Sequence, residues 1–163
     1  MRTDWTFNPI LLNGKPLEEV TSAKLLGLNI SSDLKGNVHV LELAKKASCR
    51  LYFLRQLKRS QVTPEELMLF YITCIRSILE YACPVLHRAL PGYLSEDLER
   101  LQKRALRIIY PGMSYNQALE FSGLPTLFKR REEISSKLLM KSWVTLGTLF
   151  TNFFLPRTQQ ITF

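Results

Sequence analysis

The sequence predicts a mainly α-helical fold, a helical bundle preceded by a small β-hairpin or strand element. Three observations favour this architecture. Apolar residues recur at helical spacing in successive stretches from residue 38 onward. Two of those stretches begin with residues typical of a helix start. The strand and tight-turn signals lie before residue 35.

The β element is predicted from an Asn-Gly pair and a short apolar run. Asn13-Gly14 lies between two apolar segments and is the strongest short signal for a tight hairpin turn. A second strand is expected over residues 24–30, where Gly27 indicates a bulge or the close approach of another backbone. Because an isolated hairpin is not stable in water, this element should pack on the rest of the chain.

Two long helices are expected next. Residues 38–59 place apolar side chains at helical spacing, with basic residues scattered around the axis. Thr63 and Glu66 match a capping box, with Pro64 at the first helical position between them. This start predicts a helix that continues to Pro84, which should end it.

The last third of the chain predicts further helices and an apolar tail. A short helix is expected over residues 114–121, and another should begin near Thr126. Lys129-Arg130-Arg131, near the start of the latter, indicates either a solvated basic helix start or a nuclear localisation signal. We expect three parts: a β element (1–34), a helical domain (35–142) and an apolar tail (143–163).

The stretch 95–110 predicts a helix with two opposed faces. Ser95 is a suitable N-cap, and acidic residues follow in the first turn, where the helix dipole favours them. The apolar side consists of Leu98, Leu101, Ala105, Ile108 and Ile109. The opposite side carries Arg100, Lys103, Arg104 and Arg107. Such a cationic face suits a phosphate backbone, and a solvated helix face is the alternative.

The charge of the chain favours an anionic partner. The 163 residues carry a formal net charge of +8, with a pI near 9.6. Between residues 35 and 59 there are seven basic residues and one acid, Glu42. Clustered base at this pI favours nucleic acid or an anionic surface.

The sequence also argues against several classes of protein. Three widely spaced cysteines in apolar surroundings indicate reduced thiols, and the N-terminus lacks the pattern of a signal peptide. We therefore expect a cytoplasmic or nuclear protein that is not secreted. No run approaches the roughly 20 apolar residues of a membrane span, so no membrane partner is expected. Phosphate-binding loops, paired carboxylates and an iron triad are missing, and we expect no cofactor, no metal and no catalytic residue.

Five runs of residues stand in order along the chain: KLLGLNISSDLKGNVHV, ASCRLYFLRQLKR, YITCIRSILEYACPVLHRALP, LERLQKRALRIIYPG and GLPTLFKRRE. Together they resemble the C-terminal part of non-LTR (LINE-type) retrotransposon reverse transcriptases. The resemblance covers about residues 7–138. It implies a fragment of an RNA-directed DNA polymerase, with a thumb-like helical domain but without the catalytic palm. Such a fragment should be inactive alone.

The resemblance also implies site residues and partners. Leu26, Gly27 and Leu28 match the primer grip of that family. The basic helices should face an RNA–DNA or DNA duplex and bind its phosphate backbone weakly. The missing palm and fingers of the parent polymerase are the other expected partner. The residues expected to contact phosphate are Lys46, Arg50, Arg100, Lys103, Arg104 and Arg107.

Two alternatives remain open. The chain could be a structural remnant or interaction fragment with no activity of its own. Residues 24–59 also bear a fainter resemblance to the short helical module placed ahead of some AlkB-type tRNA-modifying dioxygenases. Without the iron triad or a methyl-donor site, that resemblance implies no activity for this chain.

Overall fold

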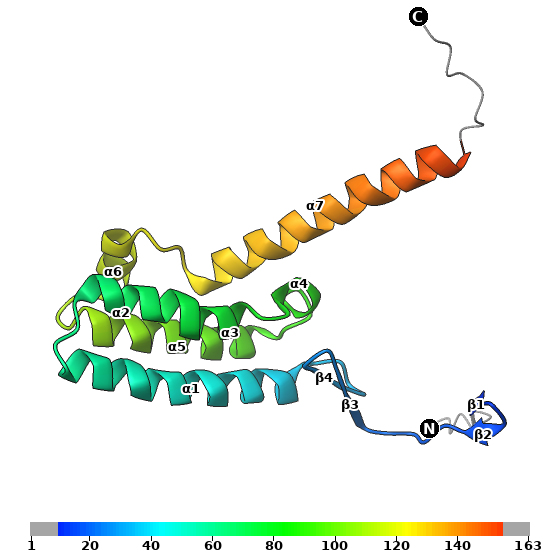
Figure 1. The fold of residues 1–163 in the computed structure, drawn as a ribbon, viewed down its shortest axis with the longest axis horizontal. Helices are drawn as coiled ribbons and strands as arrows, with labels where there is room; N and C mark the ends of the chain where they lie inside the picture. Colours follow the sequence, from blue (N-terminus) through cyan, green and yellow to red (C-terminus); the bar gives the residue numbers. More distant parts are fainter. Residues whose placement is uncertain (1–9, 155–163) are drawn as a thin grey trace, which may run out of the picture.

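The computed structural model describes the backbone of residues 10–154 and the side chains of residues 10–145 (Figure 1). Four short strands come first: β1 (Leu11–Leu12), β2 (Lys15–Pro16), β3 (Ser22–Leu25) and β4 (Leu28–Ser31). The helices are α1 (Asn37–Arg59), α2 (Pro64–Phe70), the π-helical η1 (Tyr71–Arg76), α3 (Ser77–Glu80), α4 (Cys83–Leu86), α5 (Gly92–Ile109), α6 (Tyr115–Ser122) and α7 (Leu127–Phe154). The prediction of a mainly α fold preceded by a small β element is confirmed.

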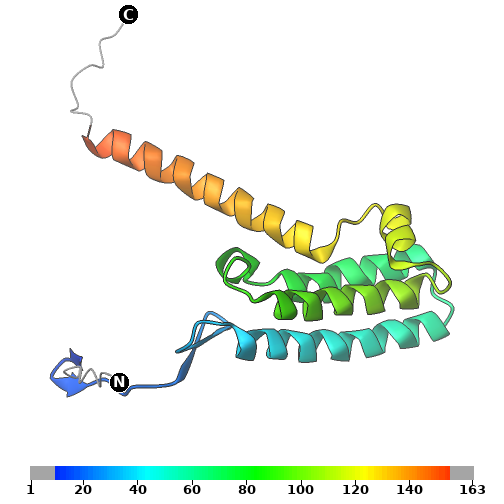
Figure 2. The ribbon, with the colours of Figure 1, turned by 180° about the vertical axis from the view of Figure 1, so that it is seen from behind.

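Three long helical segments lie side by side in the bundle, as both ribbon views show (Figures 1 and 2). Helices α1 and α5 run in the same direction: Tyr93 Oη donates to Asn37 Oδ1 at 2.6 Å at one end, and Lys58 Nζ donates to the Ile109 carbonyl at 3.2 Å at the other. The continuous helix α2–η1–α3 runs back along them. Helix α6 lies at one end of the bundle, and the outer part of α7 extends away from it.

The hydrophobic core lies between these helices. Each helix turns an apolar stripe inward, because side chains three or four residues apart share one face. The fully buried members of the core include Ala47 and Leu54 of α1, Leu67, Tyr71, Ile75 and Leu79 of α2–η1–α3, and Leu98 and Ala105 of α5. Most of the stripes predicted for residues 38–59 and 95–110 therefore lie in the core. The exceptions are Leu41, which is 67% exposed, and Ala44 and Ile108, which are half-buried.

The helix starts agree with the sequence at two positions and differ at a third. Thr63 and Ser114 each cap a helix through a complete capping box. Ser95 does not cap α5, which begins at Gly92 after the extended Pro91. The helix starts earlier because Leu94 is buried in the core and Tyr93 is held by Asn37, so packing extends the first turn.

The β element consists of two hairpins. The turn predicted at Asn13-Gly14 joins β1 to β2. The single strand expected over residues 24–30 is wrong, because Leu26 and Gly27 have φ of 48° and 78° and form a second tight turn between β3 and β4. The close approach at Gly27 is made by a side chain: a Cβ there would lie 3.0 Å from Tyr81 Oη. Strand β4 packs on α1, as expected for a hairpin that is not stable alone.

One helical stretch, Pro64–Leu86, is long and apolar enough to cross a membrane by length and composition. No stretch of this length and composition was expected from the sequence. In the bundle its buried face packs against α1 and α5. At the other end of the chain, α7 continues through residue 142 as far as Phe154.

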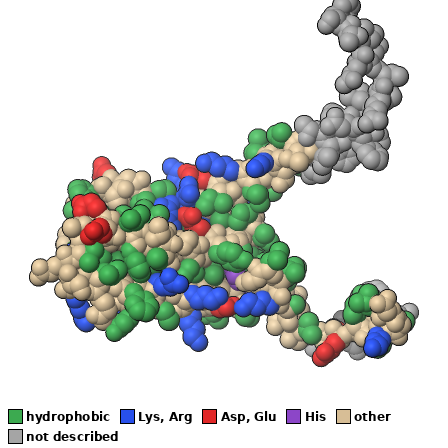
Figure 3. Space-filling view, in the orientation of Figure 1, with side chains coloured by type: hydrophobic (Ala, Val, Ile, Leu, Met, Phe, Trp, Pro, Cys, Tyr) green, Lys and Arg blue, Asp and Glu red, His purple; other side chains and the backbone are tan. Residues whose placement is uncertain are grey.

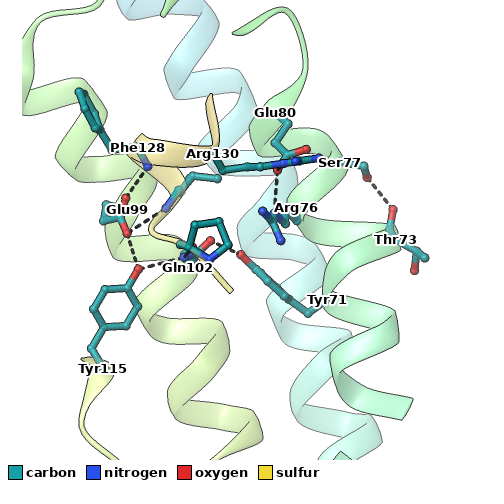
Figure 4. A network of polar contacts seen from close by, with 12 residues as sticks. Tyr71, Thr73, Arg76, Ser77, Glu80, Glu99, Gln102, Tyr115, Phe128 and Arg130 are labelled. Carbon is teal, nitrogen blue, oxygen red and sulfur yellow. Dashed lines mark hydrogen bonds and ion pairs between the residues drawn. The ribbon is translucent and has the colours of Figure 1, made fainter. Parts of the chain in front are cut away.

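A buried network of polar side chains connects the helices (Figure 4). Gln102 of α5 is fully buried, and its amide is completely paired. Tyr71 Oη donates to Gln102 Oε1 at 2.6 Å, and Gln102 Nε2 donates to Tyr115 Oη at 2.9 Å and to the Pro125 carbonyl at 3.1 Å. Four segments of the chain therefore meet at one side chain.

Two carboxylates attach α7 to this network. Glu99 of α5 accepts a hydrogen bond from Tyr115 Oη and from the first two backbone N–H groups of α7, at 3.2 and 3.0 Å. A carboxylate at a helix N-terminus is favoured by the helix dipole. Glu80 of α3 binds Arg76 at 2.7 Å and Arg130 of α7 at 3.3 Å.

We predict that Tyr71→Phe lowers the free energy of unfolding by about 1–3 kcal/mol, because it leaves the buried Gln102 oxygen without its donor. Urea unfolding followed by circular dichroism measures this. Tyr52→Phe is the matched control, since the Tyr52 side chain is 58% exposed, and it should change the free energy little. Equal effects of the two substitutions would show that the network does not stabilise the bundle.

Candidate nucleic-acid interface

The four cations predicted on α5 come together in the structure. Arg100, Lys103, Arg104 and Arg107 line one hollow of about 340 Å³ on the surface. Met113, Ser114 and Tyr115 contribute to the lining of the hollow. The cations lie on this surface because the apolar stripe of α5 is buried in the core on the opposite side.

The four cations differ in how far they are already paired. Arg100 binds Asp97 at 2.6 Å and Glu96 at 4.0 Å, so much of its charge is compensated. Lys103 Nζ lies 5.2 Å from the centroid of the Tyr115 ring, in a cation–π contact. Within the part of the chain that the structure describes, Arg104 and Arg107 make no hydrogen bond or ion pair through their side chains. These two arginines are the cations best placed to bind an external anion.

Tyr115 forms a fixed part of the hollow. Its hydroxyl donates to Glu99 and accepts from Gln102. Burial, followed by the hydrogen bond to the Glu99 carboxylate, raises the pKa of Tyr115 above its usual value. The ring is therefore neutral at physiological pH and is held in place by the buried network beneath it.

The two cations predicted on α1 lie elsewhere. Lys46 binds Glu42 at 2.8 Å and lines a different hollow, together with Gly27 and Tyr81. Arg50 lines a third hollow with Phe53 and Phe70. Lysine and arginine side chains gather along this side of α1 in the space-filling view (Figure 3). The six predicted contacts thus form one cluster on α5 and two separate positions on α1.

Glu42 interacts with Asn29 and Lys24 as well as with Lys46. The carboxylate also accepts a hydrogen bond from Asn29 and lies 3.6 Å from Lys24 Nζ. The hydrogen bond from Lys46, followed by that from Asn29, lowers the pKa of Glu42 to about 2. A phosphate that approaches Lys46 has to compete with this carboxylate.

The tip of the second hairpin carries the other predicted residues. Leu26 is 87% exposed, and its carbonyl accepts a hydrogen bond from Tyr81 Oη. Gly27 lies directly beneath that hydroxyl, and Leu28 begins β4. The turn is therefore held against α3 while the Leu26 side chain points into solvent.

The polar side chains that support the hollow were not predicted from the sequence. Glu99 was assigned to the first turn of its own helix, yet it caps α7. The position of Gln102 could have been recognised from the sequence, because it lies on the apolar face of α5 together with Leu98 and Leu106. A buried amide on that face needs hydrogen-bond partners inside the bundle. Arg131 was expected in a solvated basic segment or a localisation signal, but it is 2% exposed.

Within the described part of the chain, no three His, Cys, Asp or Glu side chains come together in a way that could hold a metal ion. Cys49, Cys74 and Cys83 are free thiols. Burial raises the pKa of the Cys83 thiol.

Comparison with known proteins gives one family match. Residues 37–77 match the family described as alkylated DNA repair protein alkB homolog 8, N-terminal. The matched segment comprises α1, α2, η1 and the first residue of α3. No curated protein and no solved structure matches the chain.

This match corrects the main interpretation of the sequence. The family found is the N-terminal region of alkB homolog 8 and not a reverse transcriptase, so the assignment to a retrotransposon polymerase fragment is wrong. Two expectations depended on that assignment and are withdrawn with it. The first is the primer-grip role of Leu26, Gly27 and Leu28, and the second is the missing palm and fingers as a partner. The fainter resemblance of residues 24–59 to an AlkB-associated helical module agrees better with the family match.

We predict that Glu42 contributes stability that depends on pH. Because its pKa in the folded chain is about 2, against an ordinary 4.5, the contribution is present above pH 4.5 and is lost as the pH falls towards 2. The difference in unfolding free energy between the natural chain and Glu42→Gln should therefore be larger at pH 6 than near pH 2.5. Glu65→Gln is the control, since none of the ion pairs among the described residues involves Glu65. A difference for Glu42→Gln that stays constant with pH would contradict the prediction.

Proposed function

We propose that this chain is a nucleic-acid-binding helical module that holds the phosphate backbone of a duplex against α5. The observation that carries the proposal is the convergence of Arg100, Lys103, Arg104 and Arg107 on one hollow. Arginine and lysine side chains on a single helix face neutralise phosphates without reading the sequence of the bases. Binding should therefore be independent of sequence.

The spacing of the cations suits a nucleic-acid strand. From Arg100 to Arg107 the rise along a helix is about 10 Å, which corresponds to about three base-pair steps along the axis of a duplex. The two arginines without internal partners lie at the C-terminal end of this span. Cations near the C-terminus of α5 are also favoured by its own dipole, so a phosphate partner adds to an already stable arrangement.

The support beneath the hollow is rigid. Tyr115 and Gln102 are linked by hydrogen bonds to α2–η1–α3 and to the segment before α7. A binding surface that is held in place before the partner arrives loses less conformational freedom on binding. This favours the α5 hollow as the phosphate-binding surface over the position of Lys46, because Lys46 already forms an ion pair with Glu42.

The family match supports the same class of partner. The matched family is named for the repair of alkylated DNA, and the match covers the paired helices on which α5 packs. We therefore propose that the chain is a helical module like the one at the N-terminus of alkB homolog 8, and that it binds nucleic acid rather than modifying it. The hollow on α5 lies outside the matched segment and is supported by the chain's own geometry.

We predict that the chain binds duplex nucleic acid with an affinity that falls linearly against salt on a log–log plot. Replacing both free arginines by Arg104→Gln and Arg107→Gln should weaken binding and reduce the magnitude of the slope by about 2. Fluorescence anisotropy with a labelled DNA duplex, an RNA–DNA hybrid and an RNA hairpin, at several salt concentrations, measures both quantities.

The matched control is the double variant Arg88→Gln and Lys129→Gln. It removes the same charge from exposed positions that line none of the hollows on α1 and α5. It should keep nearly the natural slope. Equal losses in the two double variants would show that net charge, rather than the α5 hollow, governs binding.

A further inference from the structure

A second hollow adjoins the one on α5. Its volume is about 470 Å³, which lies in the range of small-molecule sites in proteins. Lys103 and Tyr115 line both hollows, so the two cavities meet at these side chains. The α5 hollow and the second hollow therefore form one continuous surface, and phosphate binding to α5 uses only the first of them.

The two hollows differ in charge. Among the described residues that line the α5 hollow, four are cations and none is a carboxylate. The second hollow is lined by the carboxylates Glu96 and Glu99 and by the cation Lys103. The carboxylates repel a phosphate of like charge, whereas a nucleobase is uncharged at neutral pH. A strand that places its phosphates in the α5 hollow therefore places a base, and not a phosphate, in the second hollow.

Two aromatic side chains line the second hollow. Phe128, the second residue of α7, is 52% exposed, and the centroid of its ring lies 5.0 Å from that of His87. Tyr115 is held through its hydroxyl by Glu99 and Gln102. Glu99 lies between Tyr115 and Phe128 and accepts the Phe128 backbone N–H as well, as Figure 4 shows. Because every base has a π-face, aromatic rings fixed in this way suit the stacking of an unpaired base.

The second hollow also offers hydrogen-bonding groups to a ligand. Among the described residues, the side chains of Ser95 and Asn116 form no hydrogen bond with the rest of the chain. A hydroxyl and an amide each donate and accept, so together they can bind the edge of any base. In a duplex the Watson–Crick edges are already paired with the opposite strand, and only an unpaired base presents them to a protein. The second hollow thus favours an unpaired base without selecting a sequence.

The two hollows also lie at a suitable distance along α5. From Arg104 back to Glu99 the rise along a helix is about 7.5 Å, which corresponds to about two base-pair steps along the axis of a duplex. A strand whose phosphates contact Arg104 and Arg107 therefore reaches the second hollow within about two nucleotides.

We propose that the second hollow binds the base of an unpaired nucleotide next to a duplex end whose phosphates lie against α5. This inference rests on the function proposed for the α5 hollow and names its substrate class, a duplex that continues into a single strand. Phe128 stacks on the unpaired base, and Ser95 and Asn116 bind its edge. Neither interaction reads the identity of the base, so binding stays independent of sequence.

The experiment compares three labelled DNA molecules by fluorescence anisotropy with the full chain. The first is a blunt duplex, and the second is the same duplex with a short single-stranded overhang, at the 3′ or at the 5′ end. The third carries the same overhang with abasic sites, which keep the phosphates and remove the bases. We expect the intact overhang of at least one polarity to bind roughly tenfold more tightly than its abasic counterpart, because base–aromatic stacking is lost in the latter. The slope against salt should be the same for these two molecules, since their phosphates are the same.

Substitutions in the second hollow test the assignment. Phe128→Ala should remove most of the difference in affinity between the intact and the abasic overhang. Asn116→Ala should reduce that difference by about threefold. Phe121→Ala is the matched control for Phe128→Ala, because Phe121 is 68% exposed, contacts the ring of Tyr110 and lines neither hollow. It should keep the full difference. Should Phe128→Ala not fold, Asn116→Ala decides alone.

The proposal is overturned if the intact and abasic overhangs bind equally well, or if Phe128→Ala and Phe121→Ala have the same effect. Equal binding of all three DNA molecules that still weakens with Arg104→Gln and Arg107→Gln would remove the second site and leave phosphate binding to α5 standing. Binding that does not respond to the two arginine substitutions would overturn the function proposed for the α5 hollow, and this inference with it.

Discussion

The pairing of the Gln102 amide is the constraint on which the rest of the structure depends. This side chain is fully buried, and each of its hydrogen-bonding groups is used. Its partners come from the helix that precedes α5 and from two segments that follow it, so the loss of one partner leaves a polar atom unpaired in the core. The position of Tyr115, and with it the Tyr115 side of the α5 hollow, follows from this one interaction.

Helix α5 joins the core to the candidate interface. Its apolar stripe supplies the centre of the bundle, and its cationic stripe lines a hollow on the surface. Glu99 lies between these two faces and caps α7, so the same helix also sets the direction in which the last helix begins. A substitution on α5 is therefore expected to act on stability, on the hollow or on α7 according to the face it occupies.

Much of the fold was predictable because its signals are local. The capping boxes at Thr63 and Ser114 and the turn at Asn13-Gly14 depend on residues within a few positions of one another. The family assignment failed for a related reason. The runs that resembled a reverse transcriptase alternate apolar and basic residues at helical spacing. Any basic helical bundle needs that pattern, because each helix buries one face and exposes the other to solvent. The match to the alkB homolog 8 N-terminal region covers part of the same sequence.

The sequence by itself determined where most of the helices lie and which face of α5 carries its four cations, because helical periodicity and capping are properties of neighbouring residues. Only the tertiary structure decided which cations share a site. It placed those of α5 in one hollow, Lys46 against Glu42, and Arg131 in the interior, although all of them look alike as basic residues on helices. The physical reason is that the burial and pairing of a charge depend on segments far apart in the chain, which meet only when the bundle packs.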